Sequence, residues 1–208
     1  MVEQNYNIRL IVGLGNPGPE YRETRHSIGF LVLDALIRNL FGKVILKSKY
    51  NGKYIDKNIR GERIFFLKPQ TYMNLSGNSV AGICRAEKLV PEEILVIHDD
   101  MDIQLGNIKL KIGGGSAGHN GIESVIASLG SNKFTRLRVG IGRKKTMLMS
   151  DYVLSKFDAE EHVILKNSID LSVDAIKLVI TRGISVAMNA FNAKKIVNKT
   201  RSKKVEKV

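Results

Sequence analysis

The sequence contains a single cysteine, Cys84, so the chain cannot form an internal disulfide. It has no run of about 18 apolar residues, which excludes a conventional transmembrane helix. Residues 1–7 are polar and lack the apolar segment of a secretory signal peptide. These absences together fit a reducing compartment, and we expect a cytoplasmic protein.

Acidic residues are scarce, because 33 basic residues stand against 20 acidic ones and give a net charge of +13. An excess of this kind indicates a polyanionic partner, either nucleic acid or an anionic membrane surface. Segment 194–208 carries seven basic residues and one acidic, and segment 103–150 carries eight and one. The folded part therefore has a basic face of its own, besides the basic tail.

Alternating strand and helix patterns predict a single α/β domain over residues 1–193, followed by a basic tail over 194–208. The expected strands are 8–13, 53–59, 63–68, 94–98, 108–112 and 136–141. The expected helices are 28–41, 75–89, 120–129, 159–181 and 185–196. We expect a three-layer sandwich with a mixed, mostly parallel twisted sheet, because the pair 53–59 and 63–68 turns at Gly61 as a hairpin.

Polar side chains follow four of these strands. In chain order they are Asn16, His26, Asn74, Asp99, His119 and Asn120. Ligands of open α/β sheets bind outside the carboxyl ends of the strands. If the strands run mostly in one direction, one cleft collects a histidine, a carboxylate and three amides, which suit water activation and oxyanion stabilisation.

His26 and Asp99 form the candidate catalytic pair. A histidine becomes a useful base near neutral pH when a carboxylate orients it and supports its charged form. Asp99 ends a buried strand, where a carboxylate needs a hydrogen-bonded role. The alternative for His26 is a structural position beside the start of the helix. The asparagines can pair with peptide groups, although asparagine is also common in turns.

Two glycine patterns suggest other functions. Gly13, Gly15 and Gly18 fit a dinucleotide-binding fingerprint, but a polar segment follows them where a tightly packed helix should begin. We interpret these glycines as residues of a sharp turn. Gly114-x-Ser116-x-Gly118 fits a nucleophile elbow between a strand and a helix. A triad in the chain order Ser, Asp, His would need His162, which follows Asp151 and Asp158 but lies in a charged helix start. The glycine loop could equally contact a substrate backbone.

The segment His98-Asp99-Asp100-x-Asp102 could suggest a magnesium or calcium site. It lacks the spacing of a calcium loop, and no second carboxylate cluster follows a strand. The pair His98 and His26 is too small a set for a zinc site. We therefore expect no metal.

At these residues the chain resembles the bacterial-type peptidyl-tRNA hydrolases. The matching residues are Gly13–Gly18, Tyr21, Thr24–His26, Gly29, Met73–Gly77, His98–Asp102, Lys109, Lys111, Gly113–Gly121 and Arg136–Gly142. Their order and spacing hold from about residue 9 to about residue 192, which is nearly the whole body of the chain.

The resemblance implies cleavage of the ester bond between peptide and tRNA, which recycles tRNA from aborted translation. It assigns His26 as the general base, Asp99 as the residue that orients it, and Asn16 as a catalytic partner in oxyanion stabilisation. Substrate-binding residues would be Tyr21, Tyr72, Asn74, Asn120 and His119. The implied tRNA contacts are Lys109, Lys111 and Arg138, with Arg136 as a further candidate.

The resemblance also implies a mobile gate that starts at Gly113, a monomer whose partner is peptidyl-tRNA, and no metal, organic cofactor or serine nucleophile. One position departs from the family, because Ser27 stands where asparagine is usual; we expect this to tune activity. The tail over 194–208 either adds RNA affinity or only aids solubility. The competing hypotheses are a non-catalytic RNA-binding protein and a serine hydrolase that acts through Ser116.

Overall fold

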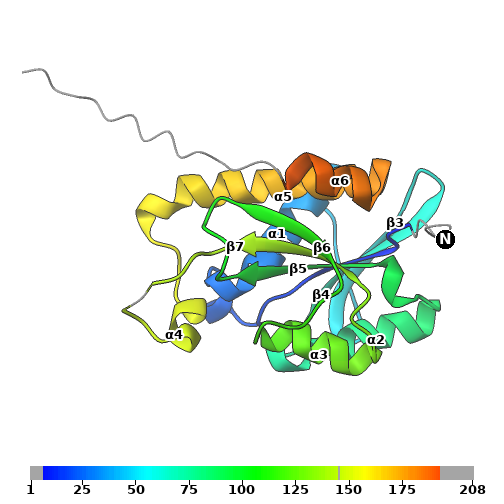
Figure 1. The fold of residues 1–208 in the computed structure, drawn as a ribbon. Helices are drawn as coiled ribbons and strands as arrows, with labels where there is room; N and C mark the ends of the chain where they lie inside the picture. Colours follow the sequence, from blue (N-terminus) through cyan, green and yellow to red (C-terminus); the bar gives the residue numbers. More distant parts are fainter. Residues whose placement is uncertain (1–6, 145, 193–208) are drawn as a thin grey trace, which may run out of the picture.

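The structure, a computed structural model, describes residues 7–144 and 146–192. These residues build one seven-stranded sheet (Figure 1). Its strands, in spatial order, are β2 (Lys47–Lys49), β3 (Gly52–Ile59), β4 (Glu62–Pro69), β1 (Leu10–Gly13), β5 (Ile94–Asp100), β7 (Thr135–Gly140) and β6 (Ile108–Ile112). The central strands β4, β1, β5 and β7 are parallel, whereas β3 and β6 are antiparallel to their neighbours. The predicted mixed, mostly parallel sheet is confirmed.

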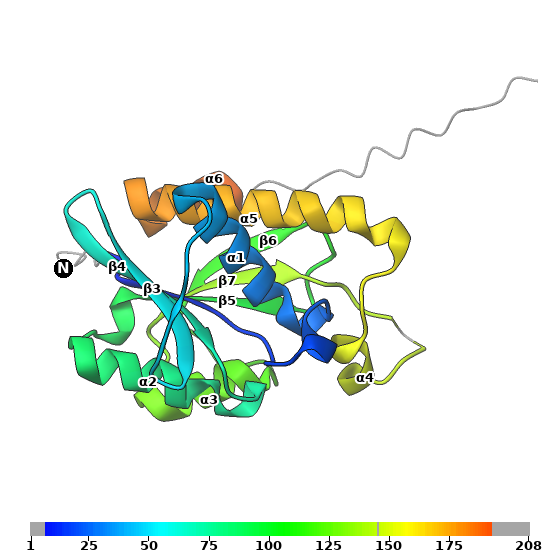
Figure 2. The ribbon, with the colours of Figure 1, turned by 180° about the vertical axis from the view of Figure 1, so that it is seen from behind.

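Helices cover both faces of the sheet, which confirms the three-layer prediction. One face carries α1 (Ile28–Phe41), α5 (His162–Arg182) and α6 (Ile184–Phe191), and the other carries α2 (Ser76–Glu87) and α3 (Asn120–Leu129). Figure 1 shows α5 and α6 above the sheet with α2 and α3 below it, and Figure 2 shows α1 crossing the same face as α5. None of the described helices is both long enough and apolar enough to cross a membrane.

The sheet separates two apolar clusters. In β1, Ile11 faces the cluster under α1, α5 and α6, while Leu10 and Val12 face the cluster under α2 and α3. Each of these side chains is fully buried and contributes about 1.5–3 kcal/mol through the hydrophobic effect. A central parallel strand is covered on both faces, which is why 8–13 reads as a nearly continuous apolar run.

Glycines bring α1 unusually close to the sheet. A Cβ at Gly13 would lie 2.3 Å from the Gly29 carbonyl oxygen, and a Cβ at Gly29 would lie 2.4 Å from the Ile97 carbonyl oxygen. The helix start is therefore held against β1 and β5, which places His26 beside the end of β5. The glycine pattern near β1 serves this packing, and after Gly18 the chain forms the short 3₁₀ helix η1 (Pro19–Tyr21).

Several details differ from the predictions. The short edge strand β2 and the helix α4 (Met149–Leu154) were not expected. The helix predicted from residue 159 begins as the 3₁₀ turn η5 (Ala159–Glu161) before α5. The helix predicted over 185–196 ends at Phe191 as α6, while positions 193–196 and the predicted tail over 194–208 lie outside the described residues.

The direction of β6 is the largest departure, because His119 and Asn120 do not follow a strand that points toward the candidate cleft. β6 runs antiparallel to β7, so its last residue, Ile112, lies opposite the first residue of β7, Thr135. The carboxyl end of β6 is therefore at the end of the sheet away from the cleft. Loop 113–118 then carries the chain back, and α3 begins beside the carboxyl end of β5. The loop, rather than the strand, delivers His119 and Asn120 to the site.

Candidate active site

A cleft of about 440 Å³ opens at the carboxyl end of β5. Its walls come from His26, from the end of β5, from the loop before α3 and from α4. Another cavity of about 470 Å³ lies between the β3–β4 turn and the α5–α6 junction, and none of the predicted site residues lines it. The cleft beside β5, by contrast, is lined by His26, Asp99, His119 and Asn120.

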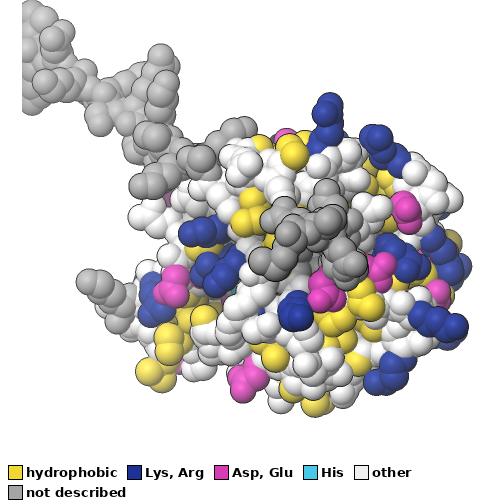
Figure 3. Space-filling view, turned by 45° about the vertical axis from the view of Figure 1, so that its right-hand side comes forward, with side chains coloured by type: hydrophobic (Ala, Val, Ile, Leu, Met, Phe, Trp, Pro, Cys, Tyr) yellow, Lys and Arg dark blue, Asp and Glu magenta, His cyan; other side chains and the backbone are white. Residues whose placement is uncertain are grey.

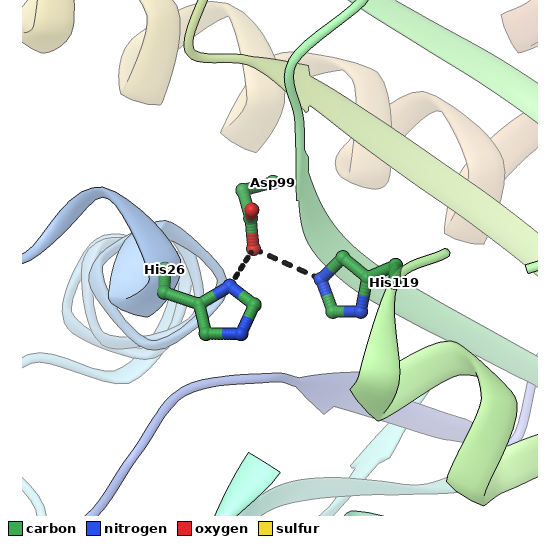
Figure 4. Close-up of side chains that lie close together, drawn as sticks. All are labelled: His26, Asp99 and His119. Carbon is green, nitrogen blue, oxygen red and sulfur yellow. Dashed lines mark hydrogen bonds and ion pairs between the residues drawn. The ribbon is translucent and has the colours of Figure 1, made fainter. Parts of the chain in front are cut away.

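Three side chains meet in this cleft (Figure 4). His26 comes from the 3₁₀ helix η2 (Arg25–Ser27), Asp99 from β5, and His119 from the position just before α3. The Nδ1 atom of His26 and the Nε2 atom of His119 each lie 2.9 Å from the same oxygen of Asp99, Oδ1. The Asp99 side chain is almost completely buried, so these bonds form in a poorly hydrated environment.

The hydrogen bonds determine where the imidazole protons lie. His119 Nδ1 accepts from the backbone N–H groups of Gly121 at 3.1 Å and Ile122 at 3.2 Å. His119 therefore carries its proton on Nε2 and donates it to Asp99. His26 donates from Nδ1 to the same carboxylate, and its Nε2 has no hydrogen-bond partner in the part of the chain that the structure describes. A lone pair on Nε2 is what a general base requires.

Burial acts to raise the pKa of Asp99, but the adjacent imidazoles of His119 and His26 outweigh it and hold this pKa below its ordinary value. The carboxylate is thus ionised at neutral pH. His98 behaves differently, because burial lowers its pKa to about 3. Its Nδ1 donates to the Asp99 carbonyl at 2.7 Å, and its buried Nε2 has no partner among the described residues. His98 is therefore neutral.

The predicted amide residues divide between the cleft and its surroundings. Asn120, the first residue of α3, lines the cleft. Asn16 is buried, and its Oδ1 accepts from the Met73 backbone N–H at 2.7 Å, which leaves its amide N–H groups as donors. Asn74 is exposed in the 3₁₀ helix η3 (Met73–Leu75), directly after Met73. The Asn16–Met73 bond thus connects the loop after β1, which carries Asn16, to η3, which carries Asn74.

The two predicted substrate-binding tyrosines stand apart from the histidine cleft. Tyr72 is 60 % exposed, and Tyr21 is partly exposed at the end of η1. Neither lines the cleft. The structure therefore brings together His26, Asp99, His119 and Asn120, while Tyr21 and Tyr72 lie outside that group.

The serine alternative lacks its expected partners. Ser116 lines the cleft, and its Oγ accepts from the Gly118 backbone N–H at 3.4 Å. His162 is exposed at the first residue of α5. His119 donates its backbone N–H to the Ser116 carbonyl, but no histidine side chain of residues 7–144 or 146–192 bonds to the Ser116 hydroxyl. The glycine loop places Ser116 in the cleft without a general base to activate it.

The acidic segment that suggested a metal is used in ion pairs. Asp100 binds Arg138 at 2.6 Å, and Asp102 binds Arg143. His26, Asp99 and His119 each offer one atom that could bind a metal, and these three atoms lie within 4.8 Å of one another. Those atoms already satisfy each other through hydrogen bonds, which fits proton transfer better than metal ligation.

The predicted tRNA-binding side chains share one face of the sheet at its β6 edge. In the register of β6 and β7, Lys109 lies opposite Arg138 and Lys111 lies opposite Arg136, and both lysines are exposed. Arg136 is buried and donates to the Gly115 carbonyl at 2.6 Å and to the Gly114 carbonyl. Burial, followed by the nearby Arg138, lowers the pKa of Arg136. Arg136 anchors the glycine loop, so its position argues against the further phosphate contact considered for it.

Net charge alone does not locate a nucleic-acid interface. Figure 3 shows Lys and Arg side chains on both the left-hand and the right-hand parts of the visible face, several of them beside acidic side chains. In the β2–β4 region, Lys47 and Arg63 both pair with Asp56. On the β6–β7 face, the exposed Lys109 and Lys111 have no such acidic partners in the described part of the chain.

Local sequence patterns do not reveal how α4 is fixed beside His26. Arg25 is buried next to His26 and binds Glu161 through two nitrogens, with one N–O distance of 3.1 Å. Its guanidinium lies 4.5 Å from the Tyr152 ring centre and 4.7 Å from that of Phe157. The only sequence signal was a basic residue beside His26, since its partners are at least 116 positions away.

Comparisons with known proteins show the family and the fold of the chain. The peptidyl-tRNA hydrolase family profile matches residues 10–199. A peptidyl-tRNA hydrolase of Geotalea uraniireducens (strain Rf4) is 47 % identical over 190 residues, covering 91 % of this chain and 99 % of that protein. One of Citrifermentans bemidjiense is 48 % identical over 186 residues, covering 89 % and 98 %. A crystal structure of peptidyl-tRNA hydrolase from Acinetobacter baumannii superimposes with a TM-score of 0.85 at 40 % identity, covering 93 % of this chain and 98 % of that chain. The chain belongs to the peptidyl-tRNA hydrolase family, as its sequence motifs predicted.

Proposed function

We propose that the chain hydrolyses the ester bond of peptidyl-tRNA with a water molecule that His26 activates, and so recycles tRNA from aborted translation. One observation carries the mechanism. His26 Nδ1 is held on the buried Asp99 carboxylate at 2.9 Å, while its Nε2 has no partner in the described residues and belongs to a ring that lines the cleft. This arrangement is that of a base oriented by a carboxylate.

The reaction needs only water and the ester. Nε2 of His26 takes a proton from water, and the water oxygen attacks the ester carbonyl carbon to give a tetrahedral oxyanion. The ionised Asp99 stabilises the imidazolium that forms. When the intermediate collapses, the ribose oxygen leaves and takes the proton from His26. The products are a free tRNA hydroxyl and the peptide carboxylic acid.

Amide donors suit the remaining requirements of this substrate. Asn16 and Asn120 would supply N–H groups to the oxyanion and to the peptide, and Asn74 would hold the peptide main chain. Tyr21 and Tyr72 would contact parts of the substrate that extend beyond the histidine cleft. A free aminoacyl group would place an ammonium against amide donors and lose its hydration, which explains a preference for peptidyl groups.

The tRNA would be positioned mainly through its phosphates by Lys109, Lys111 and Arg138, since phosphate contacts position a nucleic acid without reading its sequence. Loop 113–118 would act as the gate, anchored at its start by Arg136. We further propose that the chain acts as a cytoplasmic monomer without a metal or an organic cofactor.

The decisive experiment compares an N-blocked aminoacyl-tRNA with the same tRNA carrying a free amino group, in excess EDTA. We expect cleavage of the blocked form alone. His26→Gln should lower kcat by about 10²–10⁴-fold and preserve tRNA affinity, because general base catalysis contributes that much. His162→Gln, which changes an exposed histidine on α5, is the matched control and should retain full activity.

Other outcomes would overturn the proposal in distinct ways. Tight tRNA binding without any cleavage would favour a non-catalytic RNA-binding protein. Loss of activity in Ser116→Ala, together with a trapped acyl-enzyme, would favour the serine hydrolase. Loss of cleavage only in the presence of EDTA would indicate a metal.

A further inference from the structure

We propose that His119 is a positioning residue for the catalytic pair, which holds the Asp99 carboxylate through a neutral imidazole, and is not a ligand of the substrate. The proposal rests on the proposed function, in which Asp99 orients His26. It replaces the substrate-binding role that the family resemblance suggested for His119.

Both ring nitrogens of His119 already have protein partners. Nε2 donates to Asp99 Oδ1 at 2.9 Å, and Nδ1 accepts from the first turn of α3. An imidazole offers only these two hydrogen-bonding atoms. A substrate group could bind either nitrogen only by displacing one of these bonds.

The start of α3 fixes the tautomer of His119. The first N–H groups of a helix have no partners within the helix, and side chains before the helix commonly accept from them. His119 Nδ1 does so for Gly121 and Ile122. A proton on Nδ1 would remove both bonds and place a positive charge at the positive end of the helix dipole. The proton therefore stays on Nε2, which faces Asp99.

Two neighbouring imidazoles hold the ring of His119 in place. The His26 ring centre lies 5.0 Å away on one side, and the His98 ring centre lies 4.8 Å away in a nearly perpendicular orientation. His98 is neutral and is tied to the backbone carbonyl of Asp99. The carboxylate thus receives one side-chain N–H from His26 and one from His119, and of these two imidazoles only that of His26 keeps a ring nitrogen, Nε2, without a protein partner in the described residues.

This arrangement predicts how His119 affects the reaction. A neutral donor on Oδ1 fixes the carboxylate orientation and shares its negative charge. Without that donor, Asp99 is freer to rotate and its charge acts on His26 alone. We expect kcat to fall, because the base is held less well. We also expect the acidic limb of the kcat/KM profile to move to higher pH, because the imidazolium of His26 is better stabilised.

Few other charges face Asp99. His26 comes from η2, His119 from the start of α3, and His98 and Asp100 from β5 itself. From β7, Arg138 is paired with Asp100 and Arg136 with carbonyls of loop 113–118. At the cleft rim, Arg143 is paired with Asp102. Within the described residues, His119 is the group whose replacement alters the hydrogen bonding of Asp99 without altering the base.

Two substitutions separate the roles of the two ring nitrogens. His119→Asn keeps an acceptor for the start of α3 but is too short to reach Asp99. His119→Gln places an amide N–H near the position of Nε2 and can restore the bond to Asp99. In His119→Asn we expect a folded protein with a lower melting temperature, because a buried hydrogen bond to the Asp99 carboxylate is lost. We expect an unchanged KM for N-blocked aminoacyl-tRNA and a kcat about tenfold lower, which corresponds to one hydrogen bond to a charged group. His119→Gln should recover most of this loss.

The kinetic outcomes discriminate clearly. A higher KM with an unchanged kcat and an unchanged pH midpoint in His119→Asn would make His119 a substrate ligand. Unchanged kinetics in both variants would also overturn the proposal.

Nitrogen-15 NMR of the imidazoles provides a reading that does not depend on turnover. We expect the Nε2–H tautomer for His119 and the Nδ1–H tautomer for His26 in the unmodified chain, and loss of the fixed His26 tautomer in His119→Asn. A charged or Nδ1–H form of His119 near neutral pH would overturn the proposal. Failure of the proposed function would instead be seen as absence of hydrolysis by the unmodified chain.

Discussion

Two regions of the same sheet differ in how their polar side chains are satisfied. At the carboxyl end of β5, Asp99 is 3 % exposed and receives N–H groups from His26 and His119. On the outer face of β6, Lys109 and Lys111 are exposed, and neither forms an ion pair with any described residue. In the first region the side chains hold each other in place through hydrogen bonds, and in the second the charged groups are exposed to solvent.

The difference matches what the two proposed tasks require. Proton transfer needs donors and acceptors that are already in place, in a site where water competes little. Binding a long polyanion needs accessible charges, each of which adds modestly and loses strength in salt. Substitutions in the buried cluster should therefore change kcat, and substitutions on β6 should change affinity.

Asp99→Asn should have the largest effect. The amide can turn its NH₂ group toward His26, which favours the Nε2–H tautomer and removes the base. We expect kcat to fall by about 10²–10⁴-fold with tRNA affinity within about twofold of the unmodified chain. Single-turnover hydrolysis and filter binding measure the two quantities, and Asp174→Asn on the exposed side of α5 is the matched control. A selective loss of affinity would contradict the proposed division of tasks.

The same substitution should alter the pH dependence of stability. The pKa of Asp99 lies below its ordinary value of 3.8 in the folded chain. The carboxylate therefore stabilises the fold at neutral pH, and this contribution is lost as the pH falls below about 4. Urea unfolding at pH 7 and pH 3 should show a smaller acid-induced loss of stability in Asp99→Asn. An equal loss in both proteins would show that Asp99 contributes nothing to that dependence.

The double substitution Lys109→Ala and Lys111→Ala tests the other region. We expect tRNA affinity to fall by about tenfold or more near 0.1 M salt, because two phosphate contacts and their counterion release are lost. The slope of log affinity against log salt should become shallower by about 0.7–0.9 per contact. The kcat at saturating tRNA should not change. Lys53→Ala with Lys166→Ala removes the same charge from other exposed positions, and an equal effect there would mean that net charge alone drives binding.

Local patterns predicted the regular elements and the residues that carry the site. Helix 28–41 has the bounds of α1, because its apolar spacing is regular and Gly42 follows it. Strand 108–112 likewise has the bounds of β6. The pairing of His26 with Asp99 could be inferred because a buried strand end and a helix start each carried a group that needed a partner.

Features set by distant contacts could not be predicted. The alternation in 108–112 shows which residues face inward, but it does not reveal the direction of the strand. β2 has three exposed residues and therefore no apolar alternation, as in a short edge strand protected by lysine. The second bond of Asp99, to His119, depends on the path of loop 113–118, which nothing in the local sequence specifies.

Arg138→Ala probes the boundary between the two regions and should have a smaller effect. Its guanidinium is partly buried and donates to Asp100 at 2.6 Å, so only part of it can reach a phosphate. We expect about a threefold loss of tRNA affinity and a slightly shallower salt slope. Equilibrium binding at several salt concentrations measures both. An unchanged affinity and slope would remove Arg138 from the interface.

Ser27→Ala should have the smallest effect, although Ser27 directly follows the base. Its side chain is fully buried, and its hydroxyl contacts Thr24 Oγ1 at 3.3 Å. It does not line the cleft. We expect kcat/KM to change by less than about threefold, with a loss of about 1 kcal/mol in the free energy of unfolding.

Urea unfolding and hydrolysis of an N-blocked aminoacyl-tRNA measure the two effects of Ser27→Ala. Ser172→Ala, in the buried part of α5, is the matched control for removing a buried, hydrogen-bonded hydroxyl. A tenfold loss of kcat/KM at unchanged stability would place the Ser27 hydroxyl in the reaction itself. The expected result would instead show that a residue next to His26 in the sequence need not take part in the reaction. The catalytic region would then consist of Asp99 and the side chains that hydrogen-bond to it, not of the residues that neighbour His26 along the chain.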